Sequence, residues 1–221
     1  MKTKIISLII ALTGLNINVA QADNHALNGN VGVKVTSDYH RRGQEVSTNA
    51  VQAQLGVNSA VSNVDLFANF FTNQSTENER DSNEIVAGAG ITFLNDLVST
   101  YGGVYNTDFS DAESDLEYFV KAGLNIPLSP TLSFYRSLDT DLNTFEGQIS
   151  QSFDLKVFSV EVSGVLGNTE LSQSLDSTYS AAKLKVSKEI NGVDLYADVT
   201  LSDNNSRDYE TICGAGIQIK F

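Results

Sequence analysis

Apolar and polar residues alternate along most of this chain with a period of two. Residues 193–201, for example, read VDLYADVTL. A helix would scatter Asp194 and Asp198 among apolar side chains, whereas a strand places both on one face and the valines and leucines on the other. The same alternation occurs in residues 51–58, 116–126 and 158–163. These segments are therefore predicted to be β-strands.

Weaker alternation adds further strands at residues 29–39, 64–72, 83–93, 98–107, 131–138, 145–153, 178–188 and 210–221. Tight turns are expected at residues 94–96, 127–130, 154–155 and 190–192. Longer polar loops are expected at residues 40–49, 73–81, 108–115, 168–177 and 202–209. Short periplasmic turns that alternate with longer external loops are typical of bacterial outer-membrane barrels. The pattern predicts an all-β fold, an antiparallel up-and-down transmembrane β-barrel of about twelve strands.

The last strand resembles the closing strand of such a barrel. Ile217, Ile219 and Phe221 share one face, and Gln218 and Lys220 lie on the other. A lipid-exposed wall around a watery lumen supplies the two solvents that these faces need. The resemblance implies that the barrel-assembly machinery recognises the C-terminal strand that ends at Phe221, in the outer membrane of a bacterial cell.

The beginning of the chain predicts export. A short basic segment is followed by a compact apolar run and then by the small-x-small residues at 20–22. The apolar run is shorter than the roughly 20 residues of a spanning helix. We therefore expect a signal peptide at residues 1–22 and a single barrel domain at residues 23–221.

Alternate residues of each strand point to opposite faces of the wall, so every side chain is assigned either to the lipid or to the lumen. If Phe221, Leu195 and Tyr118 face lipid, charged residues face inward, and reversing the register would cost about 2–4 kcal/mol for each Lys or Arg near the membrane midplane. Arg136 breaks the alternation, and we expect it near an interface, where its stem can snorkel. The candidates for lining a pore are Asp38, Arg42, Asp65, Glu117, Lys121, Glu146, Glu161, Lys183, Asp194 and Asp198.

An interior with both signs of charge leaves two alternatives open. In the first, solvated charges line a narrow, porin-like channel for small solutes. In the second, acids and bases pair across the lumen and form a closed structural barrel without transport activity. Twelve strands lie between filled eight-stranded barrels and open sixteen-stranded porins, so size does not decide between them.

Composition limits the classes of partner and of chemistry that are expected for this protein. A net charge of −13 argues against nucleic-acid binding, which requires a basic surface. The expected surroundings are outer-membrane lipid and lipopolysaccharide, with the single cysteine, Cys213, facing lipid. His25 and His40 are the only histidines, and no GxSxG nucleophile motif or calcium-loop spacing occurs, so no catalytic, metal or cofactor site is predicted.

A short motif lies at the end of the first predicted strand. Residues 37–43 read SDYHRRG, which resembles the Ser-Asp-Tyr-x-x-Arg-Gly opening of a proteobacterial group of outer-membrane porins, the TorF-like or Gcw_chp group. Ser37, Asp38, Tyr39, Arg42 and Gly43 match, and Arg41 stands where an aromatic residue is expected. The resemblance implies an outer-membrane barrel, and it names no solute.

The motif also has a physical interpretation of its own. Asp38 and Arg42 share the lumen parity in a regular strand, so they are expected to pair near the pore mouth. Tyr39 is then expected at the lipid interface as a girdle aromatic. The Asp38 and Arg42 pair either filters ions or only pins the strand end to its neighbours.

Overall fold

The computed structural model describes residues 27–42, 44–77, 80–172, 175–205 and 207–221, and in these it contains twelve β-strands. The predicted signal peptide, residues 1–22, lies outside the described residues. No helix in the part of the chain that the model describes is long and apolar enough to cross a bilayer. The strands are β1 (Leu27–Arg41), β2 (Gln44–Val61), β3 (Val64–Ser75), β4 (Ser82–Phe93), β5 (Val98–Phe109), β6 (Asp115–Leu124), β7 (Thr131–Ser137), β8 (Asn143–Asp154), β9 (Ser159–Ser172), β10 (Leu175–Ile190), β11 (Val193–Asn204) and β12 (Arg207–Lys220).

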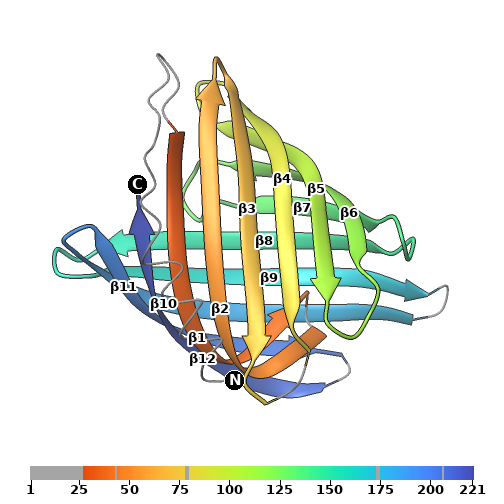
Figure 1. Ribbon diagram of the computed structural model, residues 1–221. Coiled ribbons are helices and arrows are strands. Elements are labelled where there is room, and N and C mark those ends of the chain that lie inside the picture. The colour runs from red at the N-terminus through yellow and green to blue at the C-terminus, as the bar shows by residue number, and fades with distance from the viewer. Residues whose placement is uncertain (1–26, 43, 78–79, 173–174, 206) are drawn as a thin grey trace.

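The strands form one closed antiparallel barrel. Each strand pairs with its neighbours in sequence, and β1 pairs with β12 to close the sheet. In Figure 1 the strands β2 to β5 of the near wall cross β8 to β11 of the far wall at a steep angle, as expected for strands that tilt around a barrel axis. The predicted fold class is confirmed.

The seam between β1 and β12 ends at the last residue of the chain. The Gly29 amide donates to the Phe221 carbonyl at 2.8 Å, and the Phe221 amide donates to the Gly29 carbonyl at 2.9 Å. The Phe221 ring covers Gly29, where a Cβ atom would collide with it. The terminal aromatic residue thus fills the surface that the glycine leaves bare.

The two faces of the wall differ as the alternation predicts. Large apolar side chains such as Leu132, Leu166 and Ile217 are exposed on the outer face, and Cys213 is exposed there as well. Most of the fully buried side chains in the described residues are polar, and Asn73 and Thr107 are completely inaccessible to solvent. A polar interior inside an apolar shell requires lipid around the wall.

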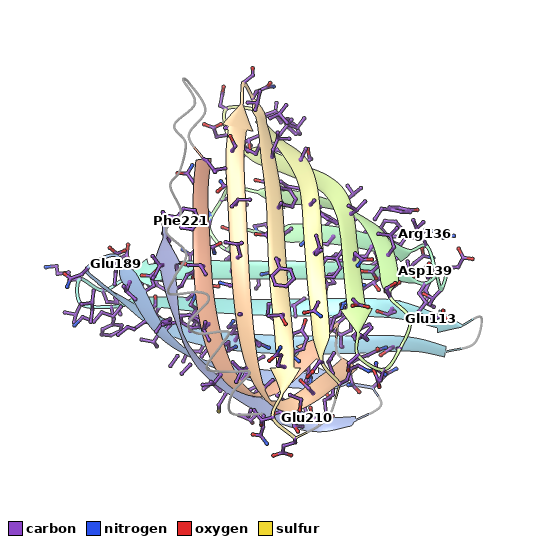
Figure 2. The ribbon with its side chains drawn as sticks, viewed as in Figure 1. Glu113, Arg136, Asp139, Glu189, Glu210 and Phe221 are labelled. Atoms are coloured by element: carbon purple, nitrogen blue, oxygen red, sulfur yellow. The ribbon has the colours of Figure 1, made fainter. Side chains whose placement is uncertain are left out.

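The two ends of the barrel carry different connections (Figure 2). Glu189 and Phe221 lie at one end, which we call the turn end, and Glu113, Arg136, Asp139 and Glu210 lie at the opposite, loop end. Positive φ angles at Asn95 (55°), Asn191 (53°) and Gly192 (80°) make the tight turns. Arg136 lies near the loop end of β7 and donates to Asp141 at 2.8 Å. Its place at a membrane interface stays a prediction.

Three of the predicted long loops are wrong. Residues 40–49, 168–177 and 202–209 mostly continue the strand pairs β1–β2, β9–β10 and β11–β12. Their polar composition indicates exposure to water, but backbone pairing beyond the membrane does not require apolar side chains. The strands therefore extend past the length that a bilayer needs.

Deleting Phe221 tests the seam. The deletion removes two backbone hydrogen bonds, so we expect the free energy of unfolding in detergent to fall by about 2 kcal/mol. Urea titration, followed by the fraction of folded protein on unboiled gels, measures this change. The Phe221→Tyr control keeps the backbone and the ring and should behave as the unmodified chain. Equal stability of the truncated and complete chains would contradict the role assigned to the seam.

Candidate functional site

The loop-end part of the β1–β2 hairpin leaves the wall and folds into the barrel. Pairing of β1 with β12 stops at Thr36 and Gly214, and pairing of β2 with β3 starts at Ala50. Beyond these points β1 and β2 pair only with each other in the described residues, as far as Arg41 and Gln44. Figure 1 shows this segment bending away from the wall. We call the described residues 37–42 and 44–49 the inner hairpin.

Irregular backbone at the base of the hairpin explains the bend. Asn49 has a φ of 45°, a left-handed conformation that asparagine tolerates better than most residues. The register between the two strands also shifts between Tyr39 and His40. Bulges of this kind bend a strand and redirect its side chains. Because the whole segment bends into the barrel, Tyr39 lies inside it, although the regular alternation would have sent it to the lipid.

Two arginines at the tip of the hairpin share one carboxylate on the opposite wall. The Arg41 Nη2 atom donates to Glu117 Oε2 at 2.8 Å, and both Arg42 Nη atoms also donate to Glu117. Glu117 belongs to β6 and is 3% exposed. Since β1 and β6 are five strands apart in a ring of twelve, this ion pair crosses the lumen. Bidentate arginine pairs of this type are strong and directional.

Aromatic rings flank the same arginines. The Arg42 guanidinium carbon lies 4.0 Å from the ring centroid of Tyr135, and that of Arg41 lies 5.1 Å from the centroid of Tyr105. Cation–π contacts add to the ion pair when the groups are shielded from water. The rings come from β5 and β7, on either side of Glu117.

Other polar contacts attach the hairpin to the remaining wall. Tyr39 donates to Glu84 of β4 at 2.5 Å, and Asn73 of β3 donates to Ser47 at 2.7 Å. His40 Nε2 lies 2.9 Å from Glu210 Oε2 on β12. The inner hairpin is therefore held from several sides of the barrel, and it narrows the lumen near the loop end.

A cavity of about 360 Å³ lies beside the inner hairpin. Its lining combines charged, aromatic and small groups, among them Lys34, Asp38, Arg42, Phe71, Glu84, Glu146 and Tyr179. The ring of Tyr179 lies over Gly167 of β9, and its hydroxyl donates to Glu146 of β8 at 2.5 Å along the wall. The cavity is large enough for several water molecules or for one small solute.

Further charged residues line the interior wall from the cavity toward the turn end. Lys34 lies 2.9 Å from Asp198, and Lys220 lies 2.7 Å from Asp194. Glu161 is opposite Lys185 in the pairing of β9 with β10. Interior parity is shared by Asp65, Lys121 and Lys183. In the part of the chain that the model describes, no group of three or more His, Cys, Asp or Glu side chains is placed to hold a metal ion.

The structure corrects two expectations about the motif at residues 37–43. Asp38 and Arg42 do not pair, because the strand is irregular: Arg42 binds Glu117, and Asp38 accepts a hydrogen bond from Ser37 at 2.8 Å. Tyr39 lies inside the barrel, not at the lipid interface. The expected turn at Gly43 lies outside the described residues.

Several residues of the site were not singled out from the sequence. Arg41, Glu84, Tyr105, Tyr135 and Tyr179 all contact the inner hairpin or its cavity. The interior parity of the last four was readable from the alternation, but their common position near the loop end depends on the register between strands. That register is a property of the folded sheet.

Comparison with known proteins identifies the fold. No family model and no curated protein matches the sequence. Among solved structures, the KdgM porin is similar with a TM-score of 0.57 and 16% identity over 88% of this chain and 99% of that one. The NanC porin is similar with a TM-score of 0.52 and 16% identity over 89% of this chain and 99% of that one. The chain thus has the fold of an outer-membrane porin barrel.

Substituting Glu117 tests what holds the inner hairpin. The Glu117→Ala variant leaves Arg42 without its carboxylate and Arg41 with only Asp115, at 3.7 Å. Breaking a buried pair from one side costs about 3–5 kcal/mol. We expect the hairpin to detach and trypsin to cleave the folded barrel after Arg41 or Arg42, whose side chains are only 15% and 13% exposed in the complete structure. Mass spectrometry of the fragments detects the cleavage.

The matched control is Asp65→Ala, which removes an interior carboxylate near the turn end. This variant should resist trypsin at the hairpin as well as the unmodified chain does. If Glu117→Ala resists equally, the ion pair is not what holds the hairpin.

Proposed function

We propose that this protein is a narrow outer-membrane channel for small solutes and that the inner hairpin sets its bore. The observation that carries the proposal is the ion pair of Arg41 and Arg42 with Glu117, which spans the lumen through polar contacts. A plug made of apolar packing would exclude water. A hairpin held by charged groups leaves polar surfaces along which water and solutes can pass.

The rest of the interior supports this function. Charged residues continue along the wall beyond the hairpin, from Asp198 to Asp194 and Lys220. Charged side chains, among them Lys34, Glu84 and Glu146, take part in the lining of the cavity beside the hairpin. Such a surface has no role in contact with hydrocarbon and suits an aqueous path. On this proposal, the ten sequence-predicted interior residues line that path.

The alternative is a closed structural barrel without transport activity. The number of strands that hold the inner hairpin favours this alternative. Glu84, Glu117 and Glu210 bind the hairpin from three different strands. If these contacts never open and leave no gap, the barrel conducts nothing. The two functions differ in a single measurable property, which is ionic current.

The remaining expectations about cellular context belong to the same proposal. Residues 1–22 direct export, the barrel-assembly machinery recognises the strand ending at Phe221, and the outer wall contacts lipid and lipopolysaccharide. We assign the chain no catalytic activity. Membership of the TorF-like group stays a prediction that rests on residues 37–43. A KdgM structure holds disordered oligogalacturonate, an acidic sugar chain, and we do not carry that solute over to this acidic protein.

Planar-bilayer recording tests the channel. The refolded chain of residues 23–221 should give small, discrete current steps. Replacing residues 38–48 by an Asn-Gly turn keeps the wall strands and removes the obstruction, so we expect steps roughly twofold larger or more. Shortening the exposed loop at residues 110–114, at the same end, is the control and should leave the steps unchanged.

Two outcomes would contradict the proposal. If the complete chain gives no current but the variant without residues 38–48 does, the protein is a closed barrel with a plug. If neither gives current, in preparations whose folding is shown on gels, no path runs along the lumen.

A further inference from the structure

The positive and negative side chains that line the cavity beside the inner hairpin differ in whether they form ion pairs. Its lysine and arginine side chains are Lys34 and Arg42. Each has an acidic partner outside the cavity lining, Asp198 at 2.9 Å for Lys34 and Glu117 for Arg42. Arg41 shares Glu117 and also lies 3.7 Å from Asp115, so two arginines face two carboxylates. His40, which also lines the cavity, lies 2.9 Å from Glu210. The positive groups of the lining are thus paired with acids that lie outside it.

The acidic groups of the same lining accept hydrogen bonds only from neutral groups. Glu84 accepts hydrogen bonds from the hydroxyl groups of Tyr39 and Tyr105, and Glu146 accepts one from Tyr179. Asp38 accepts one from Ser37. No lysine, arginine or histidine of the described residues forms an ion pair with any of these three acids. Arg42 attracts Glu146 electrostatically, but it donates its hydrogen bonds to Glu117. The carboxylates of Glu84 and Glu146 therefore add negative charge to the cavity that no ion pair offsets.

Aromatic side chains add an independent preference of the same sign. Tyr39, Phe71 and Tyr179 line the cavity together with the carboxylates. The faces of aromatic rings carry partial negative charge and attract cations. An anion that enters this space meets neither a free positive side chain nor a positive ring face.

We infer that this lumen selects small cations over anions and that Glu84 and Glu146 determine the selectivity. The inference rests on the proposed channel function and adds the class of solute to it. A cleft with walls of one sign concentrates counter-ions and repels ions of its own sign. Glu117 does not contribute, because two arginines offset its charge.

Reversal potentials across a gradient of potassium chloride test the inference. The unmodified chain should prefer potassium to chloride on the order of tenfold at low ionic strength. In Glu84→Gln and Glu146→Gln the preference should fall severalfold, and in the double variant it should approach unity. Glutamine keeps a carbonyl oxygen for the tyrosine hydroxyl, so the cavity keeps its hydrogen bonds.

Two control variants outside the cavity separate the charge of these carboxylates from the overall charge of the protein. Asp96→Asn removes an exposed carboxylate in the tight turn after β4, so it should keep the cation preference. Glu189→Gln removes one carboxylate at the turn end, away from the cavity, and should also keep it.

The possible failures can be told apart. Current steps that prefer chloride, or a cation preference unchanged in the double variant, would overturn this inference and leave the channel standing. Absence of current from folded protein would overturn the channel and this inference with it.

Discussion

Complete backbone pairing is the constraint on which the structure depends. Hydrocarbon offers no hydrogen-bonding partner, so the amide and carbonyl groups of every strand in the membrane must bond within the sheet. The barrel satisfies this by joining β1 to β12, and its last two hydrogen bonds join Gly29 to Phe221. Closure then fixes which face each side chain occupies. Apolar residues can meet lipid only if the alternate positions, with their acids and lysines, turn inward.

The same constraint explains where the hairpin can leave the wall. Residues 27–36 of β1 remain within the wall, a length close to the roughly nine to eleven residues that a tilted strand needs to cross a membrane. Beyond Thr36 water can satisfy an exposed strand edge, so β1 and β2 are free to leave their neighbours. Folding inward then buries two guanidinium groups, a cost that Glu117 and the ring of Tyr135 offset.

The alternation in the sequence was sufficient to predict the strands, the face that each side chain occupies and the barrel. Those features depend on the local residue pattern and on the difference between lipid outside and water inside. The alternation located all twelve strands and the lumen parity of Lys183, Asp194 and Asp198. It failed at residues 37–49. The inward bend of the hairpin takes Tyr39 and Arg41 inside the barrel, and the partner of Arg42 lies 75 residues away in sequence. A contact of that kind becomes visible only when the register of the intervening strands is known.

One interaction connects the shape of the lumen with its charge. Arg41 and Arg42 are the positive side chains at the tip of the inner hairpin, and binding Glu117 uses both to hold the hairpin across the barrel. Their charge is therefore not available to passing anions. The carboxylates of Glu84 and Glu146 are held by tyrosine hydroxyls, which fix their position without neutralising them. The arrangement that narrows the lumen thus also leaves these two carboxylates in it, since the arginine charges of the hairpin are paired with Glu117 and Asp115.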